Sequence, residues 1–238
     1  MTDTPQGLDA IKQELLDAAL IHVPFDGWSE AAFCAAIADS GADAAMARAA
    51  CPRGAVDLAV AYHLRGDDEM VRRLTGTDLS AMRFRDRVAL AVRYRLDAAE
   101  DKEAVRRGAT LFALPPYAAE GSRLVWGTAD RIWTALGDSS DDVNWYTKRA
   151  SLAAVYGATV LYWLGDESPG HAETDAFLDR RIGDVMQVEK VKAQVNKAWV
   201  LKPLMLGPNW LARQIRPPHL RPERRLPGSV RPCLPERT

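Results

Sequence analysis

Cysteines, long apolar runs and targeting signals are scarce or missing in this chain of 238 residues. Cys34, Cys51 and Cys233 form no C-x-x-C pair, and their odd number argues against a disulfide framework. No stretch approaches the roughly 18 apolar residues that a membrane-spanning helix needs. The first residues resemble neither a secretory signal nor an arginine-rich transit peptide. We therefore expect a protein of a reducing compartment that spans no membrane.

Catalytic motifs are missing as well. The sequence has no glycine-rich phosphate loop, no G-x-S-x-G elbow and no H-E-x-x-H pair. Its four histidines, His22, His63, His171 and His219, are scattered, and we expect them at the surface or at helix ends. A helical di-iron site would need Glu-x-x-His pairs, which do not occur. The sequence thus predicts no catalytic residue, no metal site and no cofactor.

Charge is nearly balanced overall, at −1, but it is unevenly distributed. Residues 1–75 have six basic and twelve acidic side chains, a net charge of −6. Residues 201–238 have eight basic and two acidic side chains, a net charge of +6. Such asymmetry bears on binding partners rather than on the fold.

Apolar residues recur at intervals of three and four along most of the chain, which is a helical period, and no strand-like alternation is found. Ser29 and Asp43 are suited to cap two short helices, with Gly41 at the bend between them. We expect the fourth helix to stop near Gly66 and to resume toward Leu74. The predicted fold class is all-α, with about nine or ten helices. The predicted helices cover residues 8–23, 29–37, 43–50, 56–74, 80–98, 101–113, 116–136, 142–164 and 171–198.

The first four helices, in residues 1–75, have the spacing of a helix-turn-helix module. A DNA-binding module needs cations on its second short helix, but residues 42–50 offer one arginine and one aspartate. We therefore expect a degenerate helix-turn-helix head that binds no nucleic acid. The plainer alternative is a three-helix cap that only buries core.

The end of the chain differs from the rest. Eight of the fourteen prolines lie in residues 201–238, so residues 217–238 are expected to be extended or disordered. Residues 199–216 combine tryptophans and aliphatic side chains with cations, which is typical of a segment that contacts a membrane surface. Alternatively, this segment folds back on the helical body or packs against a second copy. The predicted membrane contacts are Leu204, Met205, Leu206, Trp210 and Leu211.

Two stretches resemble known families. Residues 4–75 resemble the head of a TetR-type regulator. Residues 138–149, DSSDDVNWYTKR, are more specific. Together with Leu152, Tyr156 and the run FLDRRI at 177–182, they resemble the ninth Coq protein family, the lipid-binding accessory family of ubiquinone biosynthesis. The resemblance covers roughly residues 8–200, and Asp141 departs from it where the family usually has threonine.

This resemblance implies a TetR-like fold without DNA binding, in which a larger helical domain, residues 76–198, holds an isoprenoid or other lipid. It also implies a non-catalytic protein that presents a ubiquinone precursor to a late hydroxylase of the pathway. Family members are usually homodimers that touch the membrane through a C-terminal amphipathic helix. We accordingly expect a bacterial cytoplasmic protein, peripheral to the inner membrane. The alternative function is a TetR-type regulator that senses a small ligand.

Trp145 and Tyr146 are candidate contacts for the hydroxylase. Adjacent helical residues point about 100° apart, so both rings cannot face one narrow core stripe, and one should be exposed or half exposed. Asp142 and Arg149 complete the predicted partner surface. Alternatively, the second ring lies in a crevice, Asp142 stabilises the helix N-terminus and Arg149 is solvated.

Bulky side chains beside small ones predict a lipid cavity in the larger domain, although the same pattern also allows close helix packing. The small residues are Gly108, Ala109, Ala113, Gly127, Ala153, Ala154, Gly157 and Ala158. The predicted lipid-binding residues are Leu111, Phe112, Leu114, Trp126, Trp133, Tyr156, Val160 and Trp163.

Overall fold

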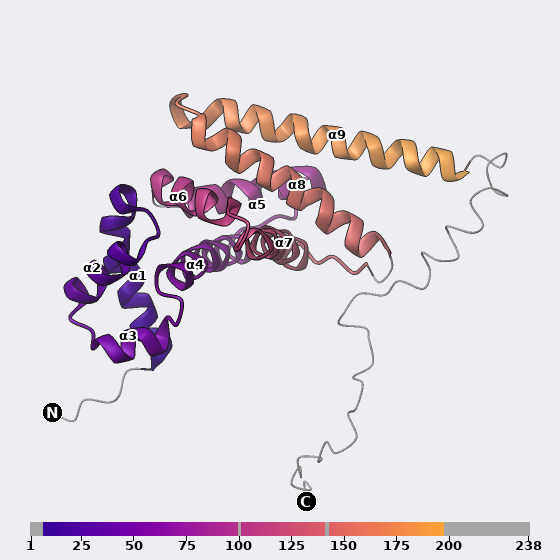
Figure 1. Cartoon of the computed structure of the whole chain (residues 1–238). Coiled ribbons are helices and arrows are strands. Elements are labelled where there is room, and N and C mark those ends of the chain that lie inside the picture. The colour runs from indigo at the N-terminus through magenta and orange to yellow at the C-terminus, as the bar shows by residue number, and fades with distance from the viewer. Residues whose placement is uncertain (1–6, 100, 141–142, 198–238) are drawn as a thin grey trace, which may run out of the picture.

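The computed structural model describes residues 7–99, 101–140 and 143–197, which form nine α-helices and one short 3-10 turn (Figure 1). No strand occurs in this part of the chain, and the predicted all-α class is confirmed. The predicted segments 199–216 and 217–238 lie outside the described residues. The helices are α1 (Leu8–Asp26), α2 (Glu30–Ser40), α3 (Ala44–Ala50), α4 (Ala55–Thr75), α5 (Phe84–Asp97), α6 (Lys102–Ala113), α7 (Ala118–Ala135), α8 (Val143–Gly165) and α9 (Ala172–Lys197).

Helices α1 to α3 and the first half of α4 form a small head at one end of the molecule (Figure 1). Its core contains Leu15, Phe33 and Leu58, all fully buried. Ser29 caps α2 by accepting a hydrogen bond from the Ala32 amide, as its sequence position predicted. Helix α3 is the second short helix of the head, so the head has the expected helix-turn-helix arrangement.

Asp43 caps α3 by accepting hydrogen bonds from the amides of Ala45 and Met46, each 3.0 Å long. Gly41 ends α2 in the left-handed conformation, with φ of +66°, which a residue without a side chain adopts at little cost. Both sequence predictions are confirmed.

Helix α4 joins the head to the body. Its first half contributes to the head core, while Met70 and Leu74 belong to a second core. The helix runs without a break from Ala55 to Thr75, so the predicted interruption at Gly66 is wrong. Gly66 is there for a packing reason, because a Cβ at this position would lie 2.6 Å from Nη1 of Arg95.

The body consists of the second half of α4 together with α5 to α9. Val92, Ile132 and Leu178 are fully buried in its core, and they come from α5, α7 and α9. Helix α9 lies along the outside of the body, where it packs on α8 and α5 (Figure 1). None of the described helices has the length and hydropathy of a membrane span.

A lipid-sized cavity and an ionic cluster on α8

A cavity of about 580 Å³ lies between α4, α5, α6, α7 and α8, and it is open to the surface. Its volume falls in the range of roughly 300–1,000 Å³ that is usual for small-molecule pockets. The lining is mostly apolar, with side chains such as Leu96, Val105 and Val125. Such a space suits an apolar ligand of lipid type.

Four of the eight predicted lipid-binding residues line this cavity, namely Phe112 from α6 and Tyr156, Val160 and Trp163 from α8. These three positions of α8 follow one another at intervals of four and three, so they share a helix face. Their predicted role in binding a lipid stays a prediction.

The other four lie elsewhere, so the prediction of one shared pocket is wrong for them. Leu111 packs on the head core, and Leu114 is 48% exposed in the turn between α6 and α7. Trp126 lies with its ring centroid 6.2 Å from that of Trp145. Trp133 lines a second cavity. The two tryptophans share a face of α7, but α7 meets the main cavity through other residues, among them Leu124 and Val125.

Small residues keep the main cavity open. Gly108, Ala109, Ala113, Ala153 and Gly157 line it, whereas the other three small residues of the predicted set, Gly127, Ala154 and Ala158, do not. A Cβ added at Gly157 would meet only Val125 Cγ1, at 3.9 Å. The cavity therefore has room for a larger side chain at this position.

One wall of the cavity is polar, where His63 and Arg95 line it. Behind them Asp67, only 1% exposed, accepts hydrogen bonds from Arg95 Nε at 2.6 Å and from Thr128 Oγ1 at 2.9 Å. Arg95 Nη2 also donates to the carbonyl oxygen of His63. No buried polar side-chain atom of the described residues lacks a partner. The polar side chains of this wall therefore form a network in which each buried polar atom has a hydrogen-bond partner.

His63 lies half-buried in the middle of α4, so the expectation that all histidines lie at the surface or at helix ends is wrong for this residue. Burial, with the nearby Arg95 guanidinium, lowers the pKa of His63 to about 4. The imidazole is therefore neutral at neutral pH. Sequence reasoning missed this network, although His63 and Asp67 stand four residues apart on one helix face.

The second cavity, of about 460 Å³, lies between α5, α7, α8 and α9. Phe84 and Trp133 stack at one side of it, with ring centroids 5.4 Å apart. Leu152 and Met186 also line it, as do Asn144 and Lys148 near the beginning of α8. This cavity therefore adjoins the most specific motif of the sequence.

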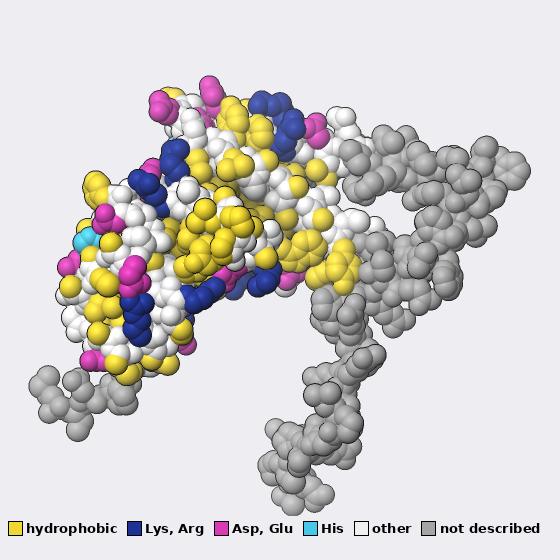
Figure 2. Space-filling view, in the orientation of Figure 1, with side chains coloured by type: hydrophobic (Ala, Val, Ile, Leu, Met, Phe, Trp, Pro, Cys, Tyr) yellow, Lys and Arg dark blue, Asp and Glu magenta, His cyan; other side chains and the backbone are white. Residues whose placement is uncertain are grey.

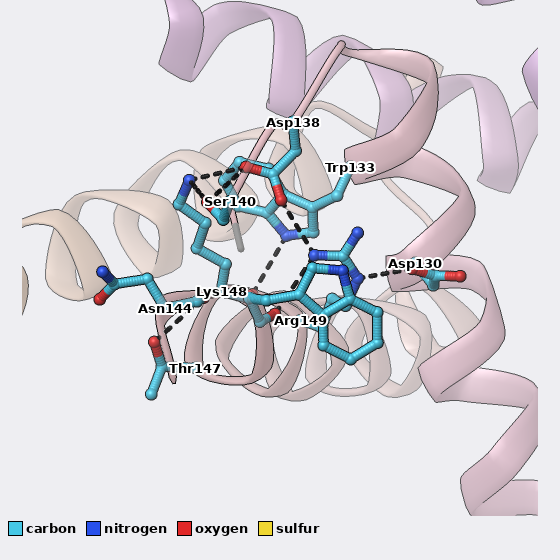
Figure 3. A network of polar contacts seen from close by, with 9 residues as sticks. Asp130, Trp133, Asp138, Ser140, Asn144, Thr147, Lys148 and Arg149 are labelled. Atoms are coloured by element: carbon cyan, nitrogen blue, oxygen red, sulfur yellow. Dashed lines mark hydrogen bonds and ion pairs between the residues drawn. The ribbon is translucent and has the colours of Figure 1, made fainter. Parts of the chain in front are cut away.

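The motif itself forms an ionic cluster (Figure 3). Arg149 Nε lies 2.5 Å from Asp130 Oδ1, and Arg149 Nη1 lies 2.9 Å from Asp138 Oδ2. Lys148 Nζ donates to Asp138 Oδ1 at 2.7 Å. The guanidinium of Arg149 also lies 4.0 Å from the ring centroid of Trp145. The cluster holds the beginning of α8 against α7, through Asp130, and against the segment that follows α7, through Asp138.

Asp138 is the centre of this cluster. Burial alone would raise its pKa, but hydrogen bonds from Lys148, Ser140 and Arg149 outweigh burial and lower the pKa to about 2. Ser140 Oγ lies 2.8 Å from Asp138 Oδ1. The carboxylate is therefore ionised at neutral pH and well into the acidic range.

Two of the predicted partner contacts are buried. Trp145 is 7% exposed and Arg149 is 3% exposed, so neither offers the accessible side chain that a docking surface needs. The reason is that Arg149 finds two carboxylates inside the fold, and its guanidinium covers the Trp145 ring. Tyr146 is half-buried, as expected for one of the two adjacent rings. Asp142 lies outside the described residues.

No group of three or more His, Cys, Asp and Glu side chains that could hold a metal ion occurs within the described ranges.

The family model COQ9 matches residues 118–189. The ubiquinone biosynthesis protein COQ9, mitochondrial, of Drosophila melanogaster is 33% identical over 192 residues, covering 79% of this chain and 59% of that protein. The protein of the same name from Homo sapiens is 27% identical over 195 residues, covering 79% of this chain and 61% of that protein. The chain thus spans about three fifths of the length of these relatives.

These relatives are named as mitochondrial proteins, and this finding overturns the expectation of a location in the bacterial cytoplasm.

A solved TetR transcriptional regulator from Nitrosomonas europaea ATCC 19718 has a similar fold, with a TM-score of 0.61. It is 18% identical, and the match covers 73% of this chain and 96% of the regulator. This likeness concerns the fold alone, and it confirms the TetR-like architecture. The matched COQ9 region contains α7, α8 and most of α9, and hence the ionic cluster and one side of the cavity. The resemblance to the ninth Coq protein family is confirmed, because the chain is similar to the COQ9 proteins and has a TetR-like fold.

Proposed function

We propose that this protein is a non-catalytic accessory protein of ubiquinone biosynthesis. It holds an isoprenoid quinone precursor in the cavity between α4 and α8 and presents it to the hydroxylase of that pathway. The observation that carries the proposal is the open, mostly apolar cavity of about 580 Å³. The names of the relatives supply the pathway. A phospholipid is the alternative occupant of the same space.

The test is mass spectrometry of lipids extracted from protein that was purified without detergent. A prenylated quinone precursor or a phospholipid should copurify with the chain. Gly157→Leu, which places a side chain inside the cavity, should reduce the lipid content strongly. Gly127→Leu is the matched control, because Gly127 is also helical, has no atom within 4 Å of an added Cβ and does not line the cavity. Equal lipid content in the two variants would contradict this use of the cavity.

The hydroxylase docks at the beginning of α8, where Tyr146 is the accessible ring of the motif. Tyr146→Ser should weaken capture of the hydroxylase in a pull-down and leave the lipid content unchanged. Asn144→Ser, at an exposed neighbouring position, is the control. Unchanged capture by the Tyr146 variant would place the docking surface elsewhere.

Residues 199–216 contact the membrane. The apolar side chains of this segment and the net charge of +6 over residues 201–238 support attraction to anionic lipid. The protein also acts as a homodimer. Full-length protein should sediment with anionic vesicles and be partly released by high salt. A chain without residues 199–238 that binds vesicles as well as the intact one would contradict this assignment, and sedimentation equilibrium tests the dimer.

A TetR-type regulator is the second candidate, and the fold favours it. The charges of the head oppose it, because Arg48, the one basic residue of α3, is paired with Glu30 and lies 4.6 Å from the Phe33 ring. Binding to duplex DNA depends on cations that are free to neutralise phosphates. We expect no duplex binding at physiological salt, and a salt-sensitive, submicromolar gel shift would favour the regulator instead.

A further inference from the structure

The main cavity reaches the surface at the turn between α6 and α7. Ala113, Ala118 and Ser122 line the cavity and are also exposed. Between them the chain reads Leu114-Pro115-Pro116, and all three of these residues are exposed. An exposed apolar surface is thus continuous with the apolar lining of the cavity. Figure 2 shows hydrophobic side chains gathered over this part of the molecule.

The backbone of this turn has no N–H group that needs water. Pro115 and Pro116 have no N–H. The amide of Leu114 donates to the carbonyl of Leu111, and the amides of Tyr117 and Ala118 both donate to the carbonyl of Leu114. Unpaired backbone N–H and C=O groups are what keep most loops out of hydrocarbon. In residues 114–118 the N–H groups are either paired or absent, so the donors of this turn add no such cost.

The surroundings of the turn are basic, in contrast to the acidic head. Residues 102–123 have four basic and two acidic side chains, a net charge of +2. Arg106 and Arg107 share Glu103 as their acidic partner. Arg123, on α7 close to the turn, is exposed and makes no hydrogen bond or ion pair with the described residues. Lys and Arg side chains lie on either side of the hydrophobic area in Figure 2.

We propose that the α6–α7 turn, residues 113–119, inserts into an anionic lipid bilayer and delivers the mouth of the cavity directly to the membrane. Leu114 and the two prolines enter the apolar layer, while the arginines of α6 and α7 lie among the phosphate headgroups. A lipid then passes between bilayer and cavity without crossing water. This proposal rests on the proposed lipid-carrying function and adds a membrane contact separate from residues 199–216.

The test places a polarity-sensitive fluorophore at position 114 of the full-length chain. Leu114→Cys is made in a chain carrying Cys34→Ser and Cys233→Ser, and labelled with a nitrobenzoxadiazole thiol reagent. Cys51 stays, because it is buried and burial raises the pKa of its thiol to about 11. Leu8→Cys in the same background is the matched control. Leu8 is 45% exposed, close to the 48% of Leu114, and it is the first residue of α1 in the head.

Phosphatidylcholine vesicles containing phosphatidylglycerol should shift the emission of the label at position 114 to the blue, and vesicles without phosphatidylglycerol should shift it less. The label at position 8 should not respond. In the unlabelled chain, Leu114→Glu should slow transfer of a fluorescent prenylated quinone between vesicles by about tenfold, because a charge replaces a leucine in the apolar layer. Leu8→Glu should transfer at the rate of the original protein.

No response at position 114, in a protein that does carry lipid, overturns this inference and leaves the proposed function intact. Emission that is already blue-shifted without vesicles also overturns it, because a segment of the chain or a second copy would then cover the turn. A protein that holds and transfers no lipid contradicts the proposed function, while the label still reports whether the turn enters a bilayer.

Discussion

Gly66 and Arg95 fit together so closely that a Cβ on residue 66 would lie 2.6 Å from Nη1 and 2.7 Å from Cζ of Arg95. The guanidinium lies across α4 at the one position where the helix has no side chain. There it reaches Asp67 and the carbonyl of His63. The position of Arg95 in the polar cavity wall therefore depends on a glycine at position 66.

The first prediction concerns this fit. Gly66→Ala should destabilise the protein by about 1–3 kcal/mol, because the methyl group overpacks the site and forces a buried, carboxylate-paired arginine to shift. Gly127→Ala should have the opposite sign and stabilise by up to about 1 kcal/mol, since an added Cβ there meets open space and alanine favours helix. Chemical denaturation of the two variants measures both effects. Equal stabilisation by both would show that Arg95 moves aside freely.

The second prediction concerns Trp145. Trp145→Lys should lower the unfolding free energy by about 3–5 kcal/mol, because a buried ring against Arg149 is replaced by a second cation. Asn144→Lys, at the exposed neighbouring position, should change it little. Thermal melting distinguishes the two. An unchanged melting temperature for the Trp145 variant would mean that its ring is not part of the core.

Much of the fold could be predicted from the sequence, because the helices follow from local patterns. The apolar period of three to four residues locates the nine described helices, and the caps at Ser29 and Asp43 depend only on neighbouring amides. The wrong break at Gly66 has a clear cause. Glycine weakens a helix by about 1 kcal/mol, and sequence alone does not show that an arginine from another helix occupies the space.

The candidate site was predicted less well, because burial of a charged residue depends on partners distant in sequence. Arg149 is read from sequence as a surface residue, but Asp130 of α7 and Asp138 bring it inside. The same holds for Arg95, which is paired with Asp67 from another helix. Helical spacing placed Trp126 and Trp133 on one face correctly, but which cavity a face meets is set by how the helices cross.

The third prediction concerns acid stability and His63. The pKa of this histidine is lowered to about 4 by burial and by Arg95, against about 6.5 in an unfolded chain. Between these values the unfolded state binds more protons, so stability is complete above about pH 6.5 and falls as the pH decreases toward 4. The full loss is about 3 kcal/mol.

Urea denaturation at several pH values between 4 and 7 measures this effect. His63→Gln should remove most of the decrease, since the amide does not titrate. His22→Gln is the control, because His22 lies near the surface beside Asp39, and it should keep the decrease. A similar pH profile for the original protein and for the His63 variant would assign the acid sensitivity to other groups.

The last prediction separates the two carboxylates that hold Arg149. The Asp138 side chain is 2% exposed and also pairs with Lys148, whereas the Asp130 side chain is 42% exposed. Asp138→Asn should therefore destabilise by about 3 kcal/mol, because two cations lose their shared partner inside the fold. Asp130→Asn should cost about 1 kcal/mol or less, since water screens that pair. Because the pKa of Asp138 is held near 2 in the folded protein, its contribution is present at pH 5 and above and decreases as the pH falls from about 4 toward 2. The difference between the two variants in urea denaturation should accordingly be large at pH 7 and shrink near pH 3. An equal loss of stability from both changes at pH 7 would mean that the two carboxylates share the arginine evenly and that Asp138 is not the centre of the cluster.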